Sequence, residues 1–350
     1  VIMLIPFTIT AVLTALIISL PKKWTTNESD TIGVQKLHKN PIPHIGGIAI
    51  FTGFFIGLWF LPAAQEIKLL LLVASLPVFI GGIAEDVTAK ITPSQRMVTI
   101  LASIIIAFYW LDIRIDSLGW LWVDDILANY TVASLLFTML IIGGATNSLN
   151  IIDGNNGLML GYGILAALAF IYIAYAVEDI LIIQLGALLV ATLLPILLFN
   201  FPFGKIFSGD GGAYFIGFTL ALIGLMLARR HQEISNWFVL LVFIYPMYEV
   251  LYSMYRRKLI TRSRTDEPDA LHLHSLIYRK VISCKKFKNN PKICNSMVSP
   301  LIWLLSLAGI LPAIVWYNNQ TVLIVFAFIF MTIYTLIYKY LSKDKFKLNH

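Results

Sequence analysis

Apolar stretches of about 20 residues recur along this chain of 350 residues, and they restrict it to a membrane fold. Each stretch can cross about 30 Å of hydrocarbon as a helix that rises about 1.5 Å per residue. Only 13% of the residues are charged, whereas a soluble domain carries about 25%. The alternating ten-residue strands of a membrane barrel are not visible. The sequence therefore predicts an all-α, polytopic membrane protein.

We predict eleven transmembrane helices in one integral membrane domain that covers residues 1–350. The predicted spans are residues 2–20, 45–61, 67–83, 97–111, 130–146, 158–177, 179–199, 213–228, 236–254, 299–317 and 321–338. Lys and Arg concentrate in cytoplasmic loops of membrane proteins. Of the 26 Lys and Arg residues, 22 fall on the face of the loop after the first span and 4 on the other. This bias predicts an outside N-terminus and a cytoplasmic C-terminus. The net charge of +7 is then a topology signal and does not indicate nucleic acid.

The rare polar clusters of the chain lie in loops of the predicted cytoplasmic face. These loops are residues 21–44, 84–96, 147–157, 200–212 and 255–298. Ionisable groups are costly near the hydrocarbon, so their collection on one face indicates chemistry there. A proton-coupled transporter is the competing class. Transporters usually hold such groups near the midplane, often in inverted repeats, and the sequence shows neither feature.

Two adjacent carboxylates, Glu85 and Asp86, follow the third predicted span. Such a pair suits a general base or a carboxylate linked to a metal ion. Lys90 and Arg96 follow closely enough to balance the charge. A solvated helix end is the alternative interpretation of two acids at this position.

The segment 147–157 is rich in Asn, Asp and Gly. Glycines allow backbone amides to approach a phosphate, and Asn and Asp offer oxygen ligands to a hard cation such as Mg²⁺. An ordinary Asn-Gly turn explains Gly154 and Gly157. It does not explain Asn150 and Asp153, which fall on one helical face just before the turn.

A single acid, Asp210, stands among small residues at the mouth of the eighth span. If the helix opens at Gly211, its positive N-terminal end faces this carboxylate and any anionic ligand. A lone Gly-Asp-Gly is also common in ordinary loops. Upstream, Asn200 ends the seventh predicted span.

The loop 255–298 adds two imidazoles, His272 and His274, among acidic and basic residues. A third zinc ligand is missing at the usual spacing, so contacts with a diphosphate fit better than zinc. A polar loop without function is the alternative. Cys284 and Cys294 also lack metal-ligand spacing, and we expect reduced thiols.

Taken in order, these motifs resemble the polyprenyl-phosphate N-acetylhexosamine-1-phosphate transferase family, glycosyltransferase family 4. This family includes the bacterial undecaprenyl-phosphate N-acetylglucosamine-1-phosphate transferases. Its Asp-Asp pair matches Glu85-Asp86, its Asn-x-x-Asp-Gly-x-(Asp/Asn)-Gly matches Asn150 to Gly157, and its Gly-Asp matches Gly209-Asp210. The likeness runs from about Asp30 to His274.

The resemblance implies transfer of a sugar-1-phosphate from a UDP-sugar to undecaprenyl phosphate, with release of UMP. It places the site on the cytoplasmic face of a bacterial inner membrane and implies Mg²⁺, with Mn²⁺ as an alternative. A homodimer stays open. The implied catalytic residues are Glu85, Asp86, Asp153 and Asp210, with Asp86 as the expected base. The implied metal ligands are Asp210 and Asn150. The implied substrate contacts are Lys39, Asn150, Asn156, Asn200, Phe207, His272 and His274, with Phe207 stacked on uracil.

Two departures from the family pattern refine these expectations. The first acid of the pair is Glu85, one methylene longer than the family's Asp. The His-Leu-His-Ser pattern resembles the N-acetylglucosamine branch more than the phospho-N-acetylmuramoyl-pentapeptide transferase of peptidoglycan synthesis, which has three consecutive His. We therefore expect an N-acetylhexosamine donor for cell-surface polysaccharide assembly and keep the peptidoglycan enzyme as the alternative.

Overall fold

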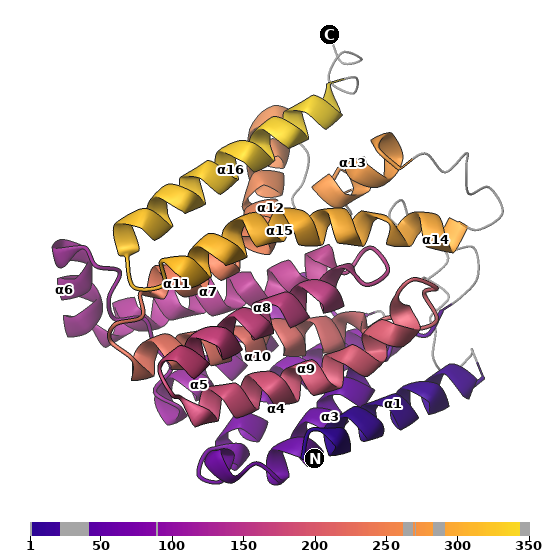
Figure 1. Cartoon of the computed structure of the whole chain (residues 1–350), viewed down its shortest axis with the longest axis horizontal. Coiled ribbons are helices and arrows are strands. Elements are labelled where there is room, and N and C mark those ends of the chain that lie inside the picture. The colour runs from indigo at the N-terminus through magenta and orange to yellow at the C-terminus, as the bar shows by residue number, and fades with distance from the viewer. Residues whose placement is uncertain are drawn as a thin grey trace.

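The computed structural model describes residues 2–21, 42–88, 90–261, 269, 271–282 and 291–343. Helices supply the regular structure of these residues, and no strand occurs among them. The predicted all-α fold is confirmed. Figure 1 shows most of the long helices running in one general direction, with α16 along one flank and α1 on the opposite one.

The chain forms the helices in the following order, interrupted by one 3₁₀ turn at Pro62–Ala64 and extended by one π-helical segment at Arg256–Thr261. They are α1 (Leu4–Ser19), α3 (Gly47–Trp59), α4 (Lys68–Thr88), α5 (Pro93–Trp110), α6 (Leu121–Asn129), α7 (Thr131–Ile152), α8 (Leu158–Ala176), α9 (Ile180–Asn200), α10 (Gly209–Arg230), α11 (Asn236–Val242), α12 (Ile244–Tyr255), α13 (Leu273–Lys280), α14 (Pro291–Ser296), α15 (Val298–Val315) and α16 (Gln320–Ser342).

A helix occupies each of the eleven predicted spans. Among the described residues, 7 helices are long and apolar enough to cross a membrane, or up to 8 if the bent pair α11 and α12 counts as one span. The helices α1 and α3 are apolar but shorter, and α5 carries Arg96 in its first turns. A polytopic membrane protein is therefore supported, while the count of eleven and the orientation stay predictions.

The helix α10 lies at the centre of the bundle and is buried on all sides. It packs against α3, α4, α7, α8 and α9, and Figure 1 shows it between the two flanks. A helix that is apolar all round belongs inside a protein. The outer helices instead expose large apolar side chains, such as Leu16 of α1 and Phe328 and Leu336 of α16, which suits contact with lipid.

Glycines bring α3 and α4 unusually close to the start of α10. A Cβ atom on Gly82 would lie 2.5 Å from the Cα of Gly211. A Cβ atom on Gly47 would lie 2.3 Å from the nitrogen of Gly212. Real Cβ atoms do not approach so closely, so only glycine fits these positions. The contact places the last turn of α4 beside the first turn of α10.

The expectation of reduced thiols is wrong for Cys294. This residue lies in α14, is buried, and is disulfide-bonded. Cys284 lies outside the described residues. The spacing of two cysteines along the chain can argue against a shared metal site. It does not argue against a disulfide, because a disulfide depends on the distance between the two sulfur atoms in the folded protein.

Candidate active site

Asp86, in the last turn of α4, binds the main chain at the start of α10. Its Oδ1 accepts a hydrogen bond of 2.7 Å from the Asp210 amide, and its Oδ2 accepts one of 2.9 Å from the Gly211 amide. The first amides of a helix have no partner within the helix, and no side chain of α10's own N-cap residue satisfies them. Asp86 therefore caps α10 from a neighbouring helix.

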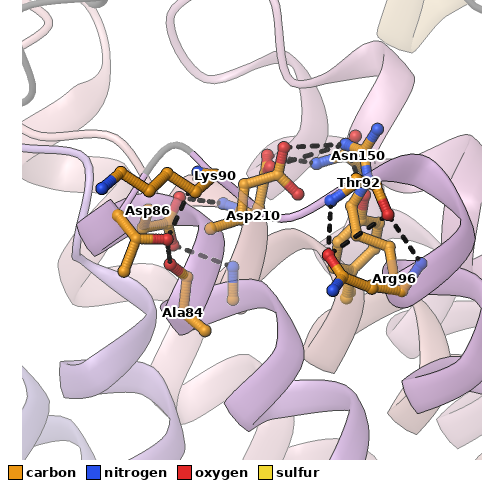
Figure 2. Close-up of polar contacts among 12 residues, drawn as sticks. Ala84, Asp86, Lys90, Thr92, Arg96, Asn150 and Asp210 are labelled. Atoms are coloured by element: carbon orange, nitrogen blue, oxygen red, sulfur yellow. Dashed lines mark hydrogen bonds and ion pairs between the residues drawn. The ribbon is translucent and has the colours of Figure 1, made fainter.

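Asp210 receives contacts from two further helices. Asn150, near the end of α7, donates from Nδ2 to Asp210 Oδ1 over 2.6 Å. Arg96, near the start of α5, places Nη1 3.9 Å from Asp210 Oδ2. Figure 2 shows Asp210 between Asp86 on one side and Asn150 on the other. The predicted acids thus meet at one point, although 124 residues separate Asp86 from Asp210.

Glu85 forms an ion pair with Arg96, whose Nη1 lies 3.1 Å from Glu85 Oε1. The other oxygen, Oε2, is buried and has no hydrogen-bond partner in the described part of the chain. Arg96 is held near the start of α5 by a capping box between Thr92 and Gln95. The predicted role of Arg96 as a balancing charge is therefore matched by a direct contact with Glu85.

Asp153 follows the last residue of α7, and the charge of Asp210 affects its pKa. Burial, together with the charge of Asp210, raises the pKa of Asp153 to about 7. A carboxyl group with this pKa exchanges its proton near neutral pH, which is a property of catalytic acids and bases. The structure therefore brings Asp153 to the same cluster as the other three predicted acids.

Asn156 and Asn200 hold loops together. Asn156 donates from Nδ2 to the carbonyl oxygen of Pro202 over 3.1 Å. Asn200 accepts from the Gly157 amide and donates from Nδ2 to the carbonyl oxygen of Ile206 over 2.6 Å. Both side chains are buried. These amides tie the loop before α8 to the loop before α10, and their contact with a nucleotide stays a prediction.

Phe207 is buried and stacks on the imidazole of His44, with ring centroids 5.1 Å apart and planes 10° apart. Its amide donates to the carbonyl oxygen of Pro43, and its own carbonyl accepts from Gly46. The segment before α3 therefore lies against the predicted uracil platform, with a flat aromatic ring on one face of it. Lys39, which belongs to the same loop in the sequence, lies outside the described residues.

His272 and His274 stack on each other, with centroids 5.4 Å apart and planes 8° apart. The Nδ1 of His272 lies 3.0 Å from Glu249 Oε1, and the Leu273 amide donates to the same oxygen over 3.0 Å. Glu249 comes from the middle of α12 and is 1% exposed. One carboxylate buried in the bundle thus fixes both the His272 ring and the start of α13.

His274 reaches the loop that carries the predicted amide and acid ligands. A Cβ atom on Gly154 would lie 3.0 Å from His274 Nε2. Burial, together with the charge of His272, lowers the pKa of His274 to about 4. The ring is therefore neutral at pH 7, and His274 can contribute hydrogen bonds but no positive charge to a bound phosphate.

Comparison with known proteins gives a matching family model. Residues 68–228 match the family model described as glycosyl transferase family 4. The matched residues are similar to members of glycosyl transferase family 4. They run from α4 to α10 and include the four acids of the cluster. His44 and the stacked histidines lie outside the matched region.

Several named proteins are similar to the chain over a longer range. A Bacillus subtilis protein named probable undecaprenyl-phosphate N-acetylglucosaminyl 1-phosphate transferase is 24% identical over 69% of this chain and 66% of its own length. Proteins of Yersinia pestis and Escherichia coli strain K12 are each 28% identical over 71% of this chain and 69% of their own lengths. Both are named undecaprenyl-phosphate alpha-N-acetylglucosaminyl 1-phosphate transferase.

The acidic cluster offers hard oxygen donors, but the described residues form no closed metal cage. Among the described residues, no group of three or more His, Cys, Asp and Glu side chains is arranged to hold a metal ion. Mg²⁺ usually takes one or two carboxylates and completes its shell with waters and substrate phosphates. Asp210 fits this role. Asn150 fits it only if its amide turns its oxygen towards the cation, because its nitrogen now faces Asp210.

Sequence reasoning missed Glu249, which contacts His272. It lies within the predicted span 236–254, where the apolar pattern hid it. A lone acid inside a predicted span was the available signal, because such residues are rare and usually functional. Arg256, which pairs with Asp269 beside His272, was missed as a member of the same cluster because it counted only as a topology charge.

Proposed function

We propose that this chain transfers N-acetylhexosamine-1-phosphate from a UDP-sugar to undecaprenyl phosphate and releases UMP. The observation that carries the proposal is the meeting of Glu85, Asp86, Asp153 and Asp210 at the start of α10, inside the region that matches the family 4 model. The names of the similar proteins supply the substrate class.

The proposed reaction is one displacement at phosphorus. An oxygen of the lipid phosphate forms a bond to the β-phosphorus of the UDP-sugar. The bond from this phosphorus to the bridging oxygen breaks, and UMP leaves with its electron pair. A phosphate monoester has a second pKa of about 6, so much of the lipid phosphate is already dianionic at neutral pH. The site therefore has to orient the nucleophile more than to deprotonate it.

The contacts divide the roles of the two adjacent acids. Both oxygens of Asp86 accept hydrogen bonds from the α10 backbone, which favours a positioning role over the expected role as base. Glu85 keeps one oxygen without a hydrogen-bond partner among the described residues. We therefore assign Glu85 to orienting the lipid phosphate and accepting any remaining proton.

Asp210 and Asn150 are the residues that would hold Mg²⁺, or Mn²⁺ in its place. A bound divalent cation would neutralise the charge that develops on the leaving UMP. The chain's own contribution is to hold these two groups together, as the 2.6 Å hydrogen bond between them does. Phe207, Asn156, Asn200 and the His272–His274 pair would then bind the rest of the donor.

The proposed orientation puts this site on the cytoplasmic face of a bacterial inner membrane, in an eleven-span protein with an outside N-terminus. The distribution of Lys and Arg supports this orientation. The acids lie at the C-terminal ends of α4 and α7 and at the N-terminal end of α10. Arg229 and Arg230 lie at the other end of α10, as the predicted topology requires.

The test measures UMP release by the purified chain from a panel of UDP-N-acetylhexosamines, with UDP-N-acetylmuramoyl-pentapeptide as the competing donor. We expect release only when both undecaprenyl phosphate and Mg²⁺ are present. Release of UMP without lipid phosphate, or no release from any donor in the panel, would contradict the proposal. Preference for the pentapeptide donor would favour the peptidoglycan alternative.

A further inference from the structure

Arg96 lies between two carboxylates of the acidic cluster, Glu85 and Asp210. Its Nη1 lies 3.1 Å from Glu85 Oε1 and 3.9 Å from Asp210 Oδ2. The same nitrogen donates to the Tyr214 hydroxyl over 3.4 Å. The Arg96 side chain is 26% exposed, so a ligand that enters the site can reach it. Figure 2 shows Arg96 and Asn150 near Asp210.

The start of α5, which carries Arg96, is fixed by contacts that do not involve these acids. Thr92 and Gln95 close a capping box at the start of α5, with hydrogen bonds of 2.9 Å and 3.3 Å. This box fixes the first turn of the helix. The guanidinium group keeps its charge at all accessible pH values. A permanent cation is therefore held beside two carboxylates that would otherwise repel each other.

We propose that Arg96 is an exchangeable counter-cation, which holds the place of the divalent cation in the nucleotide-free enzyme and couples cation binding to diphosphate binding. This inference rests on the proposed function, since it takes Mg²⁺ and a nucleotide diphosphate as the ligands of this site. It adds a residue that the motif pattern did not assign to either ligand.

The coupling follows from which charges are left without partners. A free divalent cation that binds Asp210 takes one of the two carboxylates beside the guanidinium and lies next to its fixed positive charge, so the cation alone binds weakly. A diphosphate that arrives with the cation supplies oxygens to the guanidinium, and Arg forms strong bonds to phosphate. Each ligand then raises the affinity for the other by the same factor, because binding linkage is reciprocal.

Direct binding of Mn²⁺ to the full chain in detergent tests this proposal. Electron paramagnetic resonance measures the Kd for Mn²⁺ with and without UDP, which needs no turnover. In the wild-type chain we expect UDP to tighten Mn²⁺ binding by about fivefold or more. In Arg96→Gln we expect Mn²⁺ alone to bind about fivefold or more tightly than in the wild type, and UDP to add little.

Two variants serve as controls. Arg96→Lys keeps a cation near the acids, and we expect weak binding of Mn²⁺ alone, close to that of the wild type. Lys68→Gln removes one positive charge at the other end of α4, where Lys68 contacts Gln65 and Trp59. We expect no change in Mn²⁺ affinity there, which shows that net charge alone is not responsible.

The proposal is overturned if Arg96→Gln binds Mn²⁺ alone no more tightly than the wild type, or if UDP tightens binding equally in both. If Arg96→Gln does not fold, Arg96→Lys decides the question. Tight binding of Mn²⁺ alone by Arg96→Lys would also overturn the proposal. Each result is separate from the proposed function, which fails when the wild-type chain releases no UMP.

Discussion

The backbone amide of Asp210 donates a 2.7 Å hydrogen bond to Asp86 Oδ1. Two acids that the sequence assigns to one catalytic set are therefore joined through the main chain of one and the side chain of the other. Asp86 sets where α10 begins, and α10 carries the carboxylate of Asp210. The packing of Gly82 on Gly211 allows this approach.

Replacing Asp86 with Asn tests whether Asp86 positions the helix or acts as a base. An amide keeps one acceptor oxygen, so one of the two backbone hydrogen bonds is lost, at a cost of about 1–3 kcal/mol. We expect a lower melting temperature and lower activity at every pH. If instead Asp86→Asn keeps its melting temperature and recovers activity between pH 6 and pH 9, Asp86 is the base.

Replacing Asp210 with Asn should cost several orders of magnitude in kcat, because an amide cannot balance the charge of a divalent cation. The variant should still fold, since the contact with Asp86 uses the Asp210 backbone. UMP release at saturating Mg²⁺ measures the effect, and a melting curve checks the fold. Near-normal turnover would show that Asp210 does not hold the metal.

Replacing Phe207 with Leu should raise the KM for the UDP-sugar about tenfold, since stacking on an aromatic ring contributes about 1–3 kcal/mol per base. Leu keeps an apolar side chain in this buried position but removes the flat ring. Phe207→Tyr keeps the ring and should stay close to wild type. An equal rise in the KM for the lipid substrate would argue against a uracil platform.

Replacing Glu249 with Gln should lower kcat about tenfold or more, because a hydrogen bond to a charged group contributes about 1.5–3 kcal/mol. The variant keeps the size of the side chain but loses the charge that faces His272 Nδ1. Glu233→Gln is the matched control, since Glu233 contacts His231 away from the acidic cluster. Equal losses in both variants would contradict a role for Glu249 in holding the histidine pair.

The buried His274 predicts a loss of stability in mild acid. Its pKa is about 4 in the folded protein, against 6.5 for the free side chain. Between these values the unfolded chain binds a proton that the folded chain does not, so stability falls as the pH drops from 6.5 towards 4. Melting temperatures at pH 7.5 and pH 5 measure the effect. His274→Gln should show a smaller difference, and an unchanged difference would show that His274 is not the cause.

The sequence by itself determined the fold class and which polar segments carry the site. The length of an apolar stretch can be read from neighbouring residues alone. A helix lies at each of the eleven positions that these stretches predict. The motifs were also readable in order, and Glu85, Asp86, Asn150, Asp153 and Asp210 do meet. The number of helices that cross the membrane was less readable, because α1 and α3 are short and α11 and α12 form a bent pair.

Only the tertiary structure decided what each side chain contacts. Asp86 became a helix cap because Gly82 lets α4 reach α10, and no pattern along the chain encodes that distance. Asn156 and Asn200, for which nucleotide contacts stay a prediction, also hold loops together. Glu249 lies among apolar residues in the sequence, and its contact with His272 in the fold is what indicates a role. Hydrophobic periodicity acts over a few residues, whereas these contacts depend on the packing of helices far apart in the sequence.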